Sequence, residues 1–328
     1  MTESEKVLKY LRAKSDKKLV TIEELSDHLD AGVSKVKSAL AALQKGGHNI
    51  HAISNGVNLS KMIPPSPPTF IDIRKMRGKT IRFGVTGDNH LGSKYARLDV
   101  LNALFDIWRR EGIEKVYCCG NMIDGDARFN KFDLIAHGME EQVNYFVANW
   151  PLRKGITTDF VTGDDHEGWY VQREGIDIGR FIEGRAIESG RTDLKYLGHM
   201  EADVVFKGTK RNVVMKVIHA GGGSAYATSY TAQKIVESYQ GGEKPSILLI
   251  GHFHKAEYGY PREVHCVQVG CTEDQTPFMR KKRIAAHLGG FICEVEISPE
   301  GSILRFKNEF FPFYDKSFYD KAWKYGWK

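Results

Sequence analysis

The chain has 328 residues, of which 41% are hydrophobic and 27% are charged. This balance excludes an intrinsically disordered polypeptide and allows one large α/β domain with a small accessory one. The formal net charge of +6 is compatible with an anionic partner but does not select one.

Two features of the composition bear on the compartment. No apolar run approaches the roughly 20 residues that a membrane helix needs, and the first residues lack the basic-then-apolar order of a signal peptide. The five cysteines are odd in number, and Cys118 and Cys119 are adjacent in an apolar run, which favours reduced thiols over a disulfide framework. We therefore expect a cytoplasmic protein that does not associate with membranes.

Residues 1–61 predict a small helical domain. Apolar residues recur at helical spacing within residues 3–14, and Thr21 begins a capping box for a second helix that ends near Leu29. A third helix is expected over residues 33–45, where apolar side chains line one side and two glycines follow.

A hairpin is expected after these helices, because residues 49–59 alternate in polarity around Asn55-Gly56. Three helices followed by a hairpin is the order of a winged-helix domain, and residues 34–38 would then begin the recognition helix. Two roles stay open for this winged-helix-like domain, because such units bind DNA and also mediate protein contacts.

Proline density between residues 64 and 68 predicts a linker over residues 62–78, since such a stretch continues neither a helix nor a central strand. Residues 79–328 would form the larger domain. An amphipathic helix is expected over residues 99–110. Buried strands are expected where apolar runs lead directly into short polar segments that contain glycine, namely over residues 80–85, 115–119, 158–161, 213–218 and 246–250.

Side chains that bind metals gather in five of these polar segments. The segments are Gly87-Asp88-Asn89-His90, Gly120-Asn121-Met122-Ile123-Asp124, Gly163-Asp164-Asp165-His166-Glu167, His219-Ala220-Gly221-Gly222 and Gly251-His252-Phe253-His254. Imidazole and carboxylate ligands together suit manganese, iron or zinc. Two such cations about 3.5–4 Å apart lower the pKa of a bound water and stabilise the charge that develops at a phosphate.

In the order of these motifs the chain resembles the calcineurin-like metallophosphoesterase superfamily over residues 80–270. The resemblance implies an α/β fold, a layered αββα sandwich, with two divalent metal ions at one end. Mn²⁺ is expected first, with Fe or Zn as alternatives. The ligands that the resemblance implies are Asp88, His90 and His254 for one ion, Asp165, His219 and His252 for the other, and Asn121 as the bridge.

The resemblance also implies roles at the phosphate. His166 would stabilise the transition state or protonate the leaving oxygen, and Glu167 would orient His166 or a nearby ligand. Asn89 would be a second phosphate contact. We expect Asp124 and Asp126 to support Asn121 or to cap the next helix rather than to bind metal.

The chain departs from the family pattern at two positions. Asn121 replaces the bridging aspartate, and Asp165 replaces the usual asparagine in a motif with one extra residue. The two residue types have exchanged positions, which would keep the ligand charge constant, or an Asp-to-Asn change at 121 has inactivated the enzyme. We slightly favour the second explanation, because a neutral amide is a poor bridge between two dications.

The expected function is a metal-dependent phosphodiesterase, a nuclease that acts on DNA through a hydroxide activated by two metals. The alternatives are a phosphomonoesterase acting on a protein or nucleotide and a DNA-binding protein whose catalytic site is weakened. The basic run 279–283 is expected to be solvated. The aromatic and basic segment 310–327 is expected to pack on the core or to contact a second copy of the chain, ahead of stacking on exposed bases.

Overall fold

The computed structural model describes residues 1–14, 18–53, 56–75, 80–127, 129–223, 225 and 227–313. Asn55 of the predicted turn and residues 314–327 of the predicted aromatic tail lie outside the described residues. Among the described residues, no helix combines the length and the apolar character that crossing a membrane requires.

The N-terminal domain has the predicted order of elements. It contains α1 (Glu3–Ala13), α2 (Ile22–Leu29), α3 (Val33–Lys45), β1 (Ile50–Ile53) and β2 (Gly56–Leu59). Thr2 and Thr21 begin the first two helices by accepting hydrogen bonds from backbone N–H groups three residues later. The helices and the hairpin bury one apolar cluster. Because Ile53 pairs with Gly56, Gly56 belongs to β2 and not to the predicted turn.

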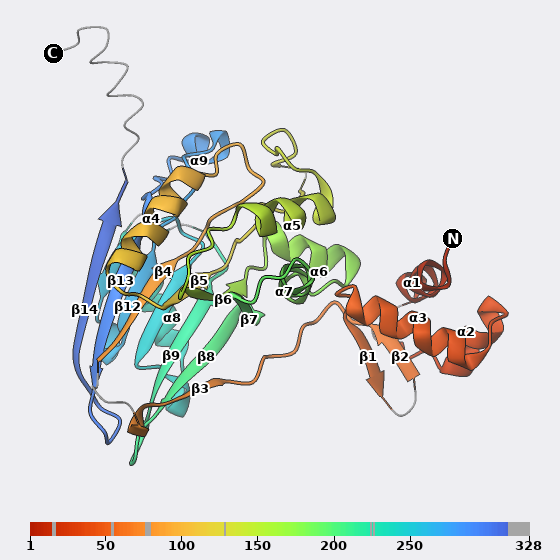
Figure 1. The fold of residues 1–328 in the computed structure, drawn as a ribbon, viewed down its shortest axis with the longest axis horizontal. Coiled ribbons are helices and arrows are strands. Elements are labelled where there is room, and N and C mark those ends of the chain that lie inside the picture. Colours follow the sequence, from red (N-terminus) through yellow and green to blue (C-terminus); the bar gives the residue numbers. More distant parts are fainter. Residues whose placement is uncertain are drawn as a thin grey trace, which may run out of the picture.

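Two six-stranded sheets form the larger domain (Figure 1). In spatial order the first sheet contains β14 (Ile303–Pro312), β13 (Gly289–Ile297), β4 (Thr80–Thr86), β5 (Lys115–Cys119), β6 (Thr157–Thr162) and β7 (Leu194–His199). The second contains β11 (Ala256–Gly259), β12 (His265–Val269), β10 (Ile247–Gly251), β9 (Asn212–His219), β8 (Glu201–Lys207) and β3 (Thr69–Asp72). Apolar side chains from both sheets share one buried cluster, so the sheets pack face to face.

Helices cover the outer face of each sheet. The first sheet packs against α4 (Leu98–Arg110), α5 (Gly138–Asn149) and α7 (Ile178–Glu188), and the second against α8 (Thr228–Ser238). The remaining helices are short: α6 (Trp169–Glu174), α9 (Pro277–Lys282) and the 3₁₀ turns η1 (Ile73–Lys75), η2 (His166–Gly168), η3 (Gly241–Glu243) and η4 (Pro261–Glu263). This confirms the expected αββα sandwich.

The predicted linker is too long at its C-terminal end. Residues 69–72 form β3, which pairs in parallel with β8 at the edge of the second sheet. Proline removes only its own N–H donor, so the residues after Pro68 remain able to pair. The chain therefore joins the larger domain before residue 79.

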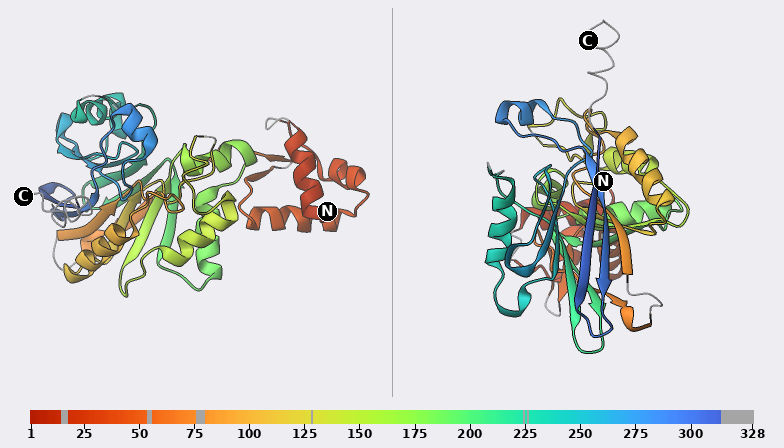
Figure 2. Two further views of the ribbon diagram at one scale, coloured as in Figure 1. Left: turned by 90° about the horizontal axis from the view of Figure 1, so that it is seen from above. Right: turned by 90° about the vertical axis from the view of Figure 1, so that its left-hand side faces the viewer.

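The N-terminal domain contacts the segment that joins α6 to α7. The Asn49 N–H donates to the Gly175 carbonyl at 2.7 Å, and the Asp177 N–H donates to the Gly47 carbonyl at 2.8 Å. Arg12 pairs with Glu174 at 3.4 Å. Figure 2 shows the domain at one end of the molecule.

Candidate metal centre

Parallel strands from both sheets end at the predicted site. β4, β5 and β6 are parallel neighbours in the first sheet, and β9 and β10 are parallel neighbours in the second. The carboxyl ends of parallel neighbours lie at one edge of a sheet, which brings together the loops that follow them. All five predicted ligand segments lie at the ends of these strands and in the loops that follow.

The backbone of these loops is unusual. Six site residues that are not glycine have positive φ angles between 47° and 87°, namely Asp88, His90, Asn121, His166, His252 and His254. Left-handed conformations cost free energy for residues with a side chain and concentrate at functional sites. The loops therefore turn sharply enough to aim consecutive motifs inward.

One ligand group combines Asp88, His90 and His254, whose candidate ligand atoms all lie within 4.8 Å of one another. Asp88 Oδ1 lies 3.9 Å from His254 Nε2. The second Asp88 oxygen accepts the His252 N–H at 2.7 Å, which fixes the carboxylate in place. The structure thus brings together the three residues predicted for the first ion.

The second group combines Asp165, His219 and His252, again within 4.8 Å. His219 Nδ1 donates to the Cys119 carbonyl at 2.8 Å, so Nε2 is directed to Asp165 Oδ1, 3.3 Å away. His252 Nε2 donates to the Gly222 carbonyl at 2.7 Å, and its Nδ1 lies 3.4 Å from Asp165 Oδ2. Each imidazole is thus held through one nitrogen and offers the other.

Asn121, the residue predicted as the bridge, lies beside Asp88 and His90 of the first group. Its Nδ2 is 3.4 Å from Asp88 Oδ1 and 3.5 Å from His90 Nε2. A Cβ at Gly163 would lie 2.8 Å from Asn121 Oδ1 and 2.7 Å from the His219 ring, so glycine is required where the loops meet.

The donor set fits two divalent cations. Within the described part of the chain, four buried site atoms form no hydrogen bond: Asn121 Oδ1, His254 Nδ1, and the pair Asp165 Oδ1 and His219 Nε2, which face each other at 3.3 Å. Unpaired buried polar atoms are costly and rare, and four of them in one place call for a ligand. Cations bound by these imidazoles and carboxylates would satisfy them.

Asp124 connects the first group to His166. Its Oδ1 accepts from His90 Nδ1 at 2.9 Å and from His166 Nδ1 at 3.0 Å. Burial alone would lower the pKa of His166, but the Asp124 carboxylate raises it to about 10. Asp124 thus supports two histidines rather than Asn121, while Asp126 accepts the Gly138 N–H at the start of α5, as a helix cap does.

Glu167 is positioned to organise loops rather than to touch a phosphate. Its buried carboxylate accepts backbone N–H groups at 2.9–3.3 Å from two of the site loops: Asn121, Met122, Ile123 and Gly163. This agrees with orientation of a nearby ligand and corrects its placement among the catalytic residues.

Asn89 does not face the phosphate position. Its Nδ2 donates to Thr86 and Thr272, its Oδ1 accepts from the Cys118 thiol, and the residue is fully buried. The prediction of a phosphate contact was wrong because the residues on either side, Asp88 and His90, turn inward and direct Asn89 into the core.

Glu273 was not predicted. Its Oε2 lies 3.7 Å from His90 Nε2, and Ser93 donates to its Oε1 at 2.9 Å. Burial raises the pKa of this carboxyl to about 7. The signal that could have found it is Gly270, which follows the strand-like stretch 264–269 and precedes Glu273, as a glycine precedes the ligands in other site segments.

Both groups open into one cavity of about 450 Å³. Its polar wall includes Asp165, His166, His252 and His254, and its apolar wall includes Phe129 and Phe278. The cavity therefore joins the candidate metal ligands to an aromatic surface.

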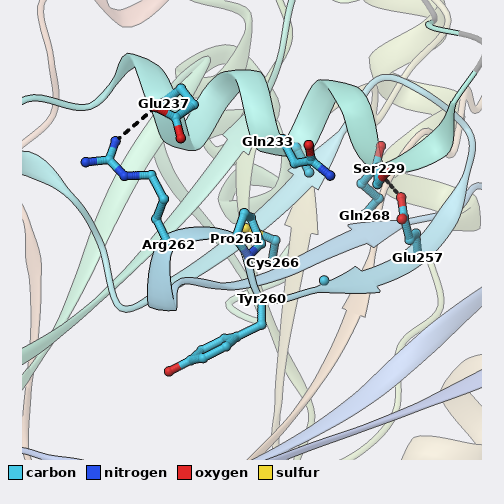
Figure 3. A pocket seen from close by; sticks show the side chains of 11 residues that line it. Ser229, Gln233, Glu237, Glu257, Tyr260, Pro261, Arg262, Cys266 and Gln268 are labelled. Atoms are coloured by element: carbon cyan, nitrogen blue, oxygen red, sulfur yellow. Dashed lines mark hydrogen bonds and ion pairs between the residues drawn. The ribbon is translucent and has the colours of Figure 1, made fainter.

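A separate hollow lies between α8 and the β11–β12 strands (Figure 3). Arg262 pairs with Glu237 at 3.4 Å, and Gln268 donates to Glu257. Its charged side chains thus have partners, and the described residues that line it include none of the predicted site residues.

No protein-family model and no curated protein sequence matches the chain. It is similar to a solved structure described as a novel archaeal phosphodiesterase, at 10% identity over 70% of this chain and 100% of that chain, with a TM-score of 0.36. It is also similar to a 5′-nucleotidase precursor from Thermus thermophilus, at 15% identity over 76% of this chain and 58% of that chain, with a TM-score of 0.38.

A third similar structure is Vps29 in complex with zinc from Entamoeba histolytica, at 14% identity over 71% of this chain and 100% of that chain, with a TM-score of 0.33. Likenesses at this level identify no substrate. The chain's own ordered motifs are clustered at the strand ends of an αββα sandwich, which is the arrangement that their resemblance to calcineurin-like metallophosphoesterases implies.

Proposed function

We propose that the chain is a metal-dependent phosphoesterase, and that it is a phosphodiesterase acting on DNA. One observation carries the proposal: members of both Asp/His groups line one cavity with Asn121 and His166, and three buried atoms of these groups and one of Asn121 form no hydrogen bond. Two bound cations, Mn²⁺ in this proposal, would lower the pKa of a water and offset the charge of the phosphate.

His166 has the geometry of a phosphate contact. It lines the cavity, and its contact with the Asp124 carboxylate favours the protonated imidazole and raises its pKa. A cationic imidazole donates a charge-assisted hydrogen bond to a phosphate oxygen and can give its proton to the leaving oxygen. Asp124 holds the ring through Nδ1, which leaves Nε2 for this task.

The N-terminal domain supports DNA as the polymer. The start of α3 presents Ser34, Lys35, Lys37 and Ser38 to solvent. Lysine and serine at an exposed helix start suit contacts with a phosphate backbone. In this proposal the domain delivers a strand to the cavity, and its contact with the α6–α7 segment holds it in place.

The test compares two small substrates and a polymer. With Mn²⁺ present, we expect bis-p-nitrophenyl phosphate to be hydrolysed faster than p-nitrophenyl phosphate, and DNA to be cleaved on a gel. His166→Ala should lower turnover by about 10²–10⁴-fold, the usual contribution of a general acid. A preference for the monoester would contradict the phosphodiesterase and favour a phosphatase.

Asn121 favours one other function, a DNA-binding protein with a weakened site. That protein would bind DNA in the presence of a chelator and hydrolyse nothing. Salt dependence checks the DNA contact itself, since binding through several phosphates falls with a log–log slope of about −0.9 per contact on duplex DNA. A flat response would argue against DNA as the partner.

A further inference from the structure

Two phenylalanines stand exposed at the mouth of the metal cavity. Phe129, from the loop before α5, is 53% exposed, and Phe278, from α9, is 51% exposed. Their ring centroids are 6.3 Å apart, and the rings are tilted by 41°. Both line the same cavity as Asp165 and His166. Figure 1 shows α9 and this loop at the same end of the molecule.

The chain holds both rings in place. The Ala127 N–H donates to Asn130 Oδ1 at 2.8 Å, and Asn130 Nδ2 donates to Asp124 Oδ2 at 3.0 Å, so the loop that carries Phe129 is tied to the metal centre. The Phe129 ring meets His166 edge to face, with centroids 5.2 Å apart. Thr276 caps α9 and so fixes the start of the helix that carries Phe278.

The placement defines what the rings can bind. A ligand whose phosphate contacts His166 would place the atoms next to that phosphate against Phe129, because the two rings are in direct contact. Half-exposed phenylalanine side chains suit a flat aromatic partner. Beside Phe278, Arg280 and Lys281 of α9 are exposed and offer cations for a further phosphate.

We propose that Phe129 and Phe278 bind the nucleobase next to the phosphate that the metal centre holds. This proposal rests on the proposed phosphoesterase function and narrows its substrate to unpaired nucleotides, free or in a single strand. A base inside a duplex has both faces stacked, so it offers no face to these rings, whereas an unpaired base stacks readily on an aromatic side chain.

The experiment measures binding to the full chain with Mn²⁺ by calorimetry. Adenosine 5′-monophosphate and ribose 5-phosphate share the phosphate and the sugar, and only the first carries a base. We expect Phe129→Ala and Phe278→Ala each to weaken the first ligand about tenfold, as for one base–aromatic stack, and to leave the second unchanged. Phe132→Ala is the matched control, because Phe132 is 84% exposed nearby and does not line the cavity.

Equal affinity of the wild-type chain for the two ligands would overturn the proposal, as would an equal loss for both ligands in Phe129→Ala. Selective binding of the base without hydrolysis of any phosphoester would uphold it while refuting the proposed function. Hydrolysis without base selectivity would do the reverse.

Oligonucleotides identify the source of the base. A single-stranded oligonucleotide that binds more tightly than the mononucleotide, and loses this advantage when its terminal nucleotide is made abasic, would show that the rings take a base from a polymer. A mononucleotide that binds as tightly as the oligonucleotide would show that the rings take a free nucleotide. Both results require the selectivity over ribose 5-phosphate described above.

Discussion

Asn121 separates the two explanations of the altered motifs. Its amide lies 3.4 Å from Asp88 Oδ1, where a carboxylate would repel its neighbour unless cations lay between them. We expect Asn121→Asp to raise Mn²⁺ affinity at least tenfold, because an added anionic ligand strengthens the hold on two dications. Calorimetric titration measures the change, and hydrolysis of bis-p-nitrophenyl phosphate should rise by orders of magnitude.

The double variant Asn121→Asp/Asp165→Asn provides the control. If the two residue types have exchanged positions, the double variant should bind Mn²⁺ as the parent does, since the total ligand charge is the same. If Asn121 simply inactivates the site, Asn121→Asp alone should be the better enzyme. Unchanged affinity and activity in Asn121→Asp would contradict the bridging role.

Glu167 should contribute to the stability of the folded chain. Its carboxylate accepts four backbone N–H groups, and an amide would present an N–H to some of them. Glu167→Gln should lower the free energy of unfolding by about 2–4 kcal/mol, since buried donors lose a charged acceptor. Urea denaturation checks this, with Glu174→Gln as the control, because Glu174 pairs with Arg12 near the surface. An equal decrease in the free energy of unfolding in both variants would contradict the role of Glu167 as an acceptor for the two site loops.

At the scale of elements, strand ends were the most predictable part of the fold. Residues 115–119 and 213–218 were expected as strands, and β5 and β9 match them within one residue at each end. Continuous apolar runs that lead into glycine and polar residues are typical of strands in a parallel sheet, as β4, β5 and β6 are. Contacts between segments were not predictable, because which side chains of a loop turn inward depends on φ angles that sequence periodicity does not report. Asn89 was predicted to contact the phosphate but lies in the core, whereas Glu273 was not predicted but lies beside His90.

The contact between the N-terminal domain and α6–α7 should depend on pH. His48 is half-buried there, and burial together with Arg12 lowers its pKa to about 4 from the ordinary value near 6.5. In the unfolded chain His48 therefore binds a proton below about pH 6.5, whereas in the folded chain it binds one only near pH 4. Stability falls as pH falls through this window, by about 1 kcal/mol once solvent screening is allowed for.

His48→Gln tests this origin. Denaturation curves between pH 7.5 and 4.5 should flatten in the variant relative to the parent, because a glutamine side chain does not titrate. The same slope in both proteins would place the pH dependence elsewhere.

For the whole molecule, metal binding should appear as stability. A ligand that binds only the folded chain at 100 times its Kd adds about 2.7 kcal/mol, which for a chain of this size raises the Tm by roughly 4 °C. We expect Mn²⁺ to produce such a shift in thermal denaturation and a chelator to reverse it. His219→Ala should reduce the shift, while His265→Ala, outside both ligand groups, should keep it. A shift that survives in His219→Ala would place the ions elsewhere.

The left-handed backbone conformation of the site loops costs conformational free energy. Each of the six residues with positive φ forgoes free energy that a glycine at the same place would not. His254→Gly should therefore weaken cation binding by the first group but relieve the strain of the positive φ angle at this position. The relieved strain should offset part of the loss in the free energy of unfolding of the metal-bound chain. If the chain no longer needed these side chains, we would expect substitution by glycine at the six positions during evolution. The four histidines, the aspartate and the asparagine found there are therefore explained by a function that needs their side chains.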